Sequence, residues 1–126
     1  MKKILIKGVL ISIFCSLFLF GSFTDKQAEK EEGTLTIVAT VTVKPEFGED
    51  VLKAIKTVVD ATRKEPGCIF YDVFEDINNS MKFVFIEIWK SQAAIDSHFR
   101  STHFNDFVKA VEGKATLEAN TFRQKF

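Results

Sequence analysis

The chain has 126 residues, with 17 basic and 17 acidic side chains and a formal net charge of zero. This balance, and the absence of a basic stripe, argues against a nucleic-acid partner. The length beyond an N-terminal leader suits one small domain. Cys15 and Cys68 are the only cysteines, so a domain that has lost the leader can form no intrachain disulfide.

Residues 1–23 have the composition of an export signal or an N-terminal membrane anchor. Lys2 and Lys3 precede an apolar run from Ile4 to Phe20, which is shorter than the roughly 20 residues that span a bilayer comfortably. The residues around Gly21 do not form a clear cleavage site, so a retained tether stays an alternative. We expect an exported protein, periplasmic or secreted, that touches the membrane only through this segment if it is uncleaved.

The remaining chain divides into a linker and a folded domain. Residues 24–33 are polar and densely charged, with no apolar face to bury. Residues 34–126 then carry regular patterns. Residues 34–43 alternate as a β-strand does, and apolar side chains recur at helical spacing from Phe47 to Thr62 until Pro66 and Gly67 end the helix.

Two strands are expected next, at Cys68–Glu75 and Lys82–Trp89, joined by a polar turn. Ser91 is a suitable N-cap for a short helix, and Ser101 or Thr102 for a second one. Residues 115–126 form the last expected strand. The order is β-α-β-β-α-β, a ferredoxin-like α+β fold.

The two middle strands predict an oligomer as well. Both faces of residues 68–74 and 83–89 are apolar, and helices on one side of a sheet leave its other side uncovered. A second copy of the same sheet is the simplest cover. We therefore expect a symmetric homodimer that packs sheet against sheet.

The candidate catalytic residues are His98 and His103, since histidine is the natural proton acceptor near neutral pH. They are five residues apart, which on one continuous helix gives different faces, and a break at Ser101 would remove that restriction. A structural role at a helix end is the alternative for each histidine.

The candidate substrate-binding residues are Trp89, Glu87, Tyr71 and Phe85. Glu87 lies between apolar neighbours and therefore needs a partner. Pairing with Arg63 or Arg123 is one explanation, and a raised pKa with an acid role is the other. Trp89 and Tyr71 suit core packing as well as a ligand site. No metal site is expected, because His98 and His103 with Asp96 or Asp106 match no known ligand spacing.

The ordered set Glu65-Pro66-Gly67-Cys68, Phe83 to Ser91, His98 and His103-Phe104 resembles the antibiotic biosynthesis monooxygenase family, and most closely its quinol monooxygenase members. The resemblance implies a dimeric α+β barrel and oxygenation of hydroquinones or polycyclic aromatics with O2, without metal, flavin or haem. A base and a dry cavity are sufficient for such chemistry, since a deprotonated hydroquinone itself reduces O2. The expected function is thus a cofactor-independent monooxygenase of a small reduced aromatic.

Three alternatives remain at this point. Haem degradation in similar folds uses an asparagine on the first strand, and residues 34–43 contain none. Isomerisation of a small phosphorylated sugar-like molecule would require an arginine cluster that is not evident. A non-catalytic dimer that binds a hydrophobic ligand in the same cavity is the third.

Overall fold

The computed structural model describes residues 33–126. The expected leader (1–23) and all of the expected linker except residue 33 lie outside the described residues. Within residues 33–126, no helix is both long and apolar enough to cross a membrane.

The described chain contains four antiparallel strands, three α-helices and one 3₁₀ turn. Their order along the chain is β1 (Leu35–Val43), η1 (the 3₁₀ turn, Pro45–Phe47), α1 (Gly48–Thr62), β2 (Cys68–Asp76), β3 (Asn79–Trp89), α2 (Gln92–Arg100), α3 (Thr102–Val111) and β4 (Ala115–Arg123). The sheet order is β2-β3-β1-β4. All three pairings are antiparallel. The expected ferredoxin-like α+β fold is confirmed.

The helices begin and end where the sequence places capping groups. The Ser91 side chain accepts a hydrogen bond from the Ala94 amide and starts α2. Ser101 does the same for α3 through the Phe104 amide. The chain is extended at Ser101, with φ −68° and ψ 150°. The two separate helices expected after Ser91 are therefore confirmed, with the break between them at Ser101.

The β2–β3 hairpin is tighter than expected. The strands extend to Asp76 and from Asn79, so only Ile77 and Asn78 form the turn. The Asp76 carboxylate accepts a hydrogen bond from the Asn78 amide, a side-chain turn that the composition could not distinguish from a longer loop.

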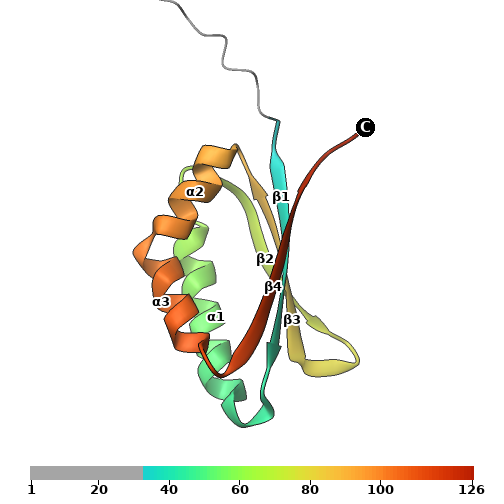
Figure 1. Cartoon of the computed structure of the whole chain (residues 1–126), viewed down its shortest axis with the longest axis vertical. Coiled ribbons are helices and arrows are strands. Elements are labelled where there is room, and N and C mark those ends of the chain that lie inside the picture. Colours follow the sequence, from blue (N-terminus) through green and yellow to red (C-terminus); the bar gives the residue numbers. More distant parts are fainter. Residues whose placement is uncertain (1–32) are drawn as a thin grey trace, which may run out of the picture.

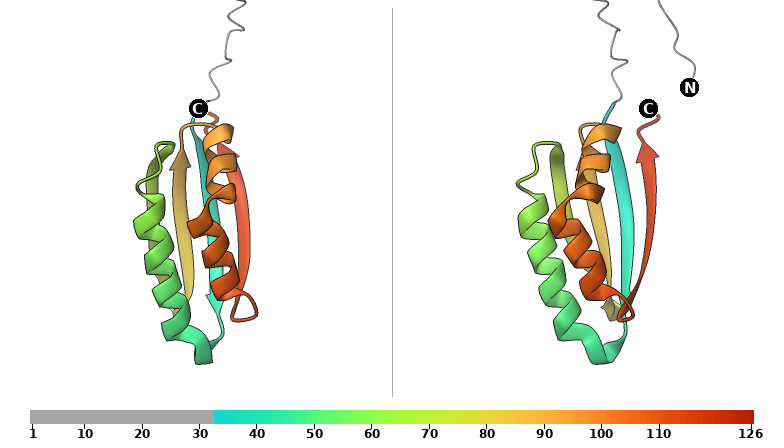
Figure 2. Two further views of the ribbon diagram at one scale, coloured as in Figure 1. Left: turned by 90° about the vertical axis from the view of Figure 1, so that its left-hand side faces the viewer. Right: turned by 60° about the vertical axis from the view of Figure 1, so that its left-hand side comes forward.

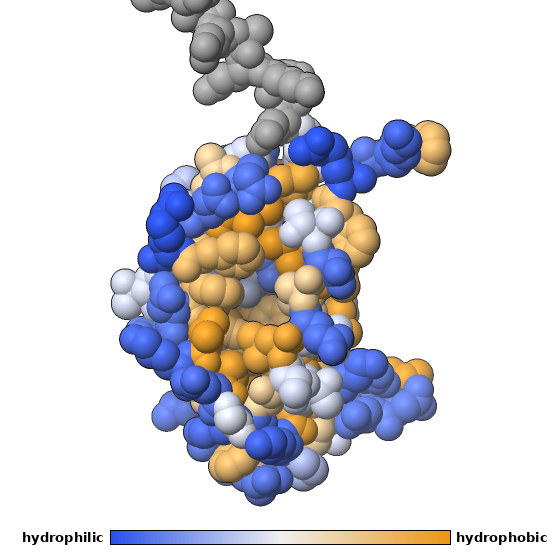
Figure 3. All heavy atoms as spheres, in the orientation of Figure 1, coloured by the Kyte–Doolittle hydropathy of each residue, from blue (hydrophilic) through white to orange (hydrophobic). Residues whose placement is uncertain are grey.

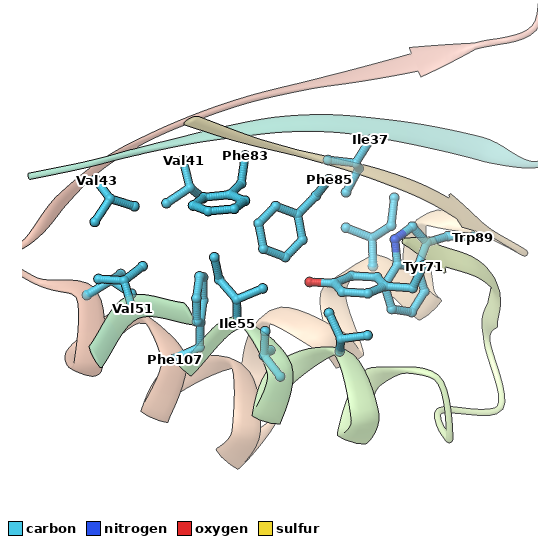
Figure 4. Packing of buried hydrophobic residues seen from close by; sticks show 14 of the residues in the cluster. Ile37, Val41, Val43, Val51, Ile55, Tyr71, Phe83, Phe85, Trp89 and Phe107 are labelled. Carbon is cyan, nitrogen blue, oxygen red and sulfur yellow. The ribbon is translucent and has the colours of Figure 1, made fainter. Parts of the chain in front are cut away.

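All three helices cover one face of the sheet, so the domain has two layers (Figure 1). Figure 2 shows α1 beside the α2–α3 arm, with α1 on the β2 side of the sheet and the arm on the β4 side. The core lies between the layers, where Val41, Phe83 and Phe85 from the sheet meet Ile55 and Phe107 from the helices (Figure 4).

No helix of the described residues covers the other face of the sheet, which is largely apolar. The strand register places Phe70 opposite Ile88, Asp72 opposite Ile86 and Phe74 opposite Val84 on this outer face. Phe74 is 52% exposed. An aromatic side chain so exposed on a continuous sheet is unfavourable in water.

Gly67 sets the distance between β2 and α2. A Cβ atom at Gly67 would overlap the Ala94 side chain, and the Gly67 carbonyl accepts a hydrogen bond from the Lys90 amide at 3.0 Å. The start of β2 therefore cannot move away from α2 without losing a bond to the end of β3.

Replacing Gly67 by alanine should lower the free energy of unfolding by about 1–3 kcal/mol, the usual cost of overpacking. Urea denaturation followed by circular dichroism measures this. Gly33→Ala is the control, because no atom lies within 4 Å of a Cβ there. Equal stability of the two variants would show that α2 does not depend on the close approach at Gly67.

Candidate active site

A cavity of about 240 Å³ lies between the sheet and the α2–α3 arm. Its wall is mostly aliphatic and aromatic, and the lining residues are Ile37, Ala39, Val41, Tyr71, Phe85, Glu87, Phe99, Phe104, Phe107, Leu117, Glu118 and Ala119. Figure 3 shows the hollow between the helices and β4, with an apolar floor. An apolar pocket with few polar groups is the usual form of a small-molecule site.

Glu87 is the buried carboxylate of this wall. It lies on the inner face of β3, a central strand, and the residue is only 5% exposed. The Trp89 Nε1–H donates a hydrogen bond of 2.9 Å to Glu87 Oε2. Burial raises the pKa of Glu87 to about 7, although the Trp89 hydrogen bond acts in the opposite direction. Near neutral pH this group therefore exists in both its acid and its base form.

Arginine pairing, one of the two expected explanations for Glu87, is wrong for Arg63. The Arg63 side chain forms an ion pair with Asp72 and donates to the Tyr71 carbonyl. The other explanation, a raised pKa, is what the structure shows. Trp89 is the partner instead of a cation, so the carboxylate is oriented but not neutralised.

Tyr71 and Phe85 complete this end of the cavity. Tyr71 is opposite Glu87 across the β2–β3 ladder, and its ring meets the Phe85 ring edge-on at 5.8 Å between centroids. Burial, and next the Glu87 carboxylate, raise the pKa of Tyr71 far above its usual range. The phenol thus stays protonated and is a hydrogen-bond donor. Its hydroxyl points into the space between the layers (Figure 4).

Three of the four expected substrate-binding residues, Glu87, Tyr71 and Phe85, line the cavity. Trp89 does not. It is fully buried behind the wall, where it fixes the Glu87 carboxylate and packs on His98 with 4.7 Å between ring centroids.

His98 and His103 converge on one carboxylate, that of Glu65. Glu65 Oε1 is 2.7 Å from His98 Nδ1 and 2.6 Å from His103 Nε2. His98 is fully buried, and burial lowers its pKa, while Glu65 raises it by hydrogen bonding and by charge. The break at Ser101 brings the two imidazoles together, with 5.8 Å between ring centroids.

Neither histidine lines the aromatic cavity directly. The His98 ring is behind Tyr71 and Phe104, at 5.8 and 4.8 Å between centroids. His103 lines a separate, more open groove of about 320 Å³ between α1 and α3. Their expected catalytic roles stay a prediction.

Glu65, His98 and His103 also hold ligand atoms that all lie within 4.8 Å of one another. The carboxylate-to-imidazole distances of 2.6 and 2.7 Å are hydrogen-bond distances. The arrangement favours a hydrogen-bonded cluster over a metal centre. Asp96, one acidic residue considered with the histidines, accepts a hydrogen bond from Gln92 instead.

The sequence did not single out Glu65 as a site residue, because it precedes Pro66-Gly67 at the end of a helix and is 33 positions from His98. The sequence held one indication of such a residue: two histidines lie on either side of a helix break, and each needs a hydrogen-bond acceptor. The aromatic side chains of the arm, Phe99, Phe104 and Phe107, were also missed as cavity residues because their helical spacing suits ordinary core packing.

Comparison with known proteins agrees with this architecture. The family model for the antibiotic biosynthesis monooxygenase matches residues 34–110. YcnE of Bacillus subtilis (strain 168), provisionally named a monooxygenase, is 36% identical over 85 residues, which cover 68% of this chain and 87% of YcnE. YgiN of Escherichia coli (strain K12), named a probable quinol monooxygenase, is 29% identical over 96 residues, covering 68% of this chain and 91% of YgiN.

Solved structures show the same likeness. The crystal structure of PA3566 from Pseudomonas aeruginosa superposes with a TM-score of 0.72 at 28% identity, covering 76% of this chain and 98% of that one. The two-layer α+β fold is thus shared with this solved structure. This chain belongs to the antibiotic biosynthesis monooxygenase family.

Glu87 should make stability depend on pH. The pKa of Glu87 is about 7 in the folded state, against the ordinary 4.5 of a glutamate. Between these values the folded state holds a proton that the unfolded state has lost, so stability falls as pH rises through this window. Above pH 7 the loss is about 3 kcal/mol, at 1.36 kcal/mol per pKa unit. Glu87→Gln removes the charge but keeps an acceptor for Trp89.

Urea unfolding between pH 4 and pH 8 tests this expectation. The Glu87→Gln variant should exceed the unchanged protein in stability at pH 8 and match it at pH 4. Glu75→Gln, an exposed position on the same face of the sheet, should follow the unchanged protein throughout. A pH-independent difference for Glu87→Gln would contradict the raised pKa.

Proposed function

We propose that the protein is a cofactor-independent monooxygenase that oxidises a reduced, hydroquinone-like aromatic with O2. The observation that carries this proposal is an aromatic cavity whose wall holds Glu87, a carboxyl group with a pKa of about 7. At about 240 Å³ the cavity is smaller than the roughly 300–1,000 Å³ of drug-sized sites, which favours a small flat substrate. The quinol monooxygenase name of YgiN supports the same substrate class.

The reaction balances without another reductant. A hydroquinone and O2 give a hydroxyquinone and water, so the substrate supplies all four electrons that O2 accepts. One oxygen atom enters the ring and the other leaves as water. Removal of a hydroxyl proton starts the reaction, because the resulting anion transfers an electron to O2 much more readily.

Glu87 is the group that we assign to this first proton. It lines the cavity, it is half ionised near neutral pH, and Trp89 fixes one of its oxygens. Tyr71 donates a hydrogen bond to a substrate oxygen, and Phe85 and Phe104 hold the ring. Oxygen then joins a ring carbon to form a peroxide, and the loss of the proton on that carbon breaks the O–O bond.

The alternatives have less support in the cavity. A haem group is larger than this space, and β1 has no asparagine. A phosphorylated substrate would need a cation, and the cavity lining includes no lysine or arginine. A binding module without catalysis remains as an outcome of the assay below.

Oxygen uptake by the purified protein with a panel of dihydroquinones tests the function. We expect turnover with at least one member, and a drop of about 100-fold or more in kcat for Glu87→Gln, as general-base removal usually costs. Glu75→Gln, on the same sheet face but outside the cavity lining, should retain the activity. Tight binding of the dihydroquinones without any oxygen uptake would show a binding module instead.

We also propose that the protein is an exported homodimer that packs through the outer face of the sheet. The support is the apolar outer face described above, with Phe70, Phe74 and Phe122 each more than one-third exposed. A second sheet is the cover with the same shape and chemistry. Export rests on the composition of residues 1–23 alone.

Phe74→Lys should convert the dimer to a monomer in size-exclusion chromatography with light scattering, since it places a charge in the proposed interface. Phe74 is half exposed in the single chain, so the variant should still fold. Ile77→Lys at the hairpin tip, 96% exposed, is the control that should remain dimeric. A monomeric unchanged protein would refute the proposed dimer.

A further inference from the structure

The cluster of Glu65, His98 and His103 contains a fully buried imidazole with one nitrogen to spare. Nδ1 of His98 is bonded to Glu65, whereas His98 Nε2 is buried and has no hydrogen-bond partner among the described residues. An unpaired buried polar atom is costly, and such an atom beside a candidate active site is a reason to look for a function.

The hydrogen bonds assign the protons of both rings. A carboxylate accepts, so His98 Nδ1 carries the proton. Burial lowers the pKa of His98 and favours the neutral ring, in which Nε2, without a partner among the described residues, keeps its lone pair. Ser101 Oγ donates to the His98 carbonyl at 2.7 Å and is 3.1 Å from His103 Nε2. The hydroxyl proton of Ser101 is already donated to the His98 carbonyl, so toward His103 the Ser101 oxygen can only accept a hydrogen bond. His103 Nε2 therefore carries a proton as well. Glu65 thus holds both imidazoles by their N–H groups.

The position of His98 relates this lone pair to the cavity. Tyr71, Phe99 and Phe104 each lie within 6 Å of the His98 ring between centroids, and all three line the cavity. One layer of aromatic side chains therefore separates His98 from the substrate space. Transfer of a proton from the cavity to His98 therefore requires one of these side chains to turn aside, and Phe99, 44% exposed, is the least enclosed of the three.

We propose that Glu65 is a positioning residue that holds His98 as the Nδ1–H tautomer, so that His98 Nε2 accepts the second proton of the reaction. This inference rests on the proposed function, in which Glu87 takes the hydroxyl proton first. The second proton is the one on the oxygenated ring carbon. Its transfer to Nε2 leaves an electron pair that forms the new C=O bond as the O–O bond breaks, and the released hydroxide takes up a proton to become water.

The charges around His98 favour this role for Glu65. Glu65 faces it from the α1–β2 connection and His103 from α3, while Tyr71 on β2 and Glu87 on β3, beyond Trp89, are the other titratable groups nearby. Glu65 at 2.7 Å stabilises the imidazolium that forms when Nε2 is protonated. His103 opposes it, but its proton donated to Glu65 keeps that carboxylate in place.

The test combines nitrogen-15 NMR of His98 with oxygen uptake, on the unchanged protein and on Glu65→Ala and Glu65→Gln. In the unchanged protein at pH 7, Nδ1 should have a protonated and Nε2 an unprotonated shift. Resorcinol, whose meta hydroxyls cannot form a quinone, should shift the Nε2 resonance on binding.

Glu65→Ala should mix the two tautomers of His98 and lower kcat by about 100-fold. Glu65→Gln should restore the tautomer, because its amide oxygen accepts the same bonds, but lower the pKa of His98.

A protonated Nε2 in the unchanged protein, an unaltered tautomer in Glu65→Ala, or full activity of both variants would overturn the inference. Asp96→Asn on α2 is the matched control, since its carboxylate contacts only Gln92 in the hydrogen-bond network. The two proposals fail differently. Lack of oxygen uptake by the unchanged protein refutes the monooxygenase, whereas an active protein that is indifferent to Glu65 refutes only the positioning role.

Discussion

The burial of the Glu87 carboxylate without a cation is the constraint on which the site depends. A central strand of an apolar sheet is a costly place for a charge, and a single hydrogen bond from Trp89 compensates only part of that cost. The consequence is a group that exchanges a proton near neutral pH. An arginine in place of Trp89 would give a more stable ion pair and a carboxylate that could no longer accept a proton at that pH.

The two-layer fold supplies the surroundings for this carboxylate. Helices cover only one face of the sheet, and beside β4 this inner face leaves room for a cavity between the sheet and the arm. The helix break at Ser101 has a double effect. It lets α2 and α3 follow the curved sheet, and it brings His98 and His103 to the same carboxylate. The same helix break that shapes the fold therefore also brings the titratable side chains of the cluster together.

Local patterns were sufficient to predict the elements, because alternation, capping serines and the Pro66-Gly67 stop each act within a few residues. The sequence also indicated Glu87, Tyr71 and Phe85 as candidate binding residues, and the structure places all three along one cavity. The contact of Glu65 with two histidines was not predictable in this way, since it depends on how the end of α1 meets the α2–α3 arm. The choice of Trp89 over Arg63 as the partner of Glu87 depends on side-chain reach and on competition from Asp72, which spacing does not encode.

The central claim is that Glu87 changes its protonation state near neutral pH. Carbon-13 NMR of the Glu87 carboxyl group, followed from pH 3 to pH 9, measures this directly. The structure predicts a midpoint of about 7. A midpoint near 4.5, the ordinary value for a glutamate, would contradict the account, because the carboxylate would then be fully ionised at the pH where the proposed reaction needs it to exchange protons.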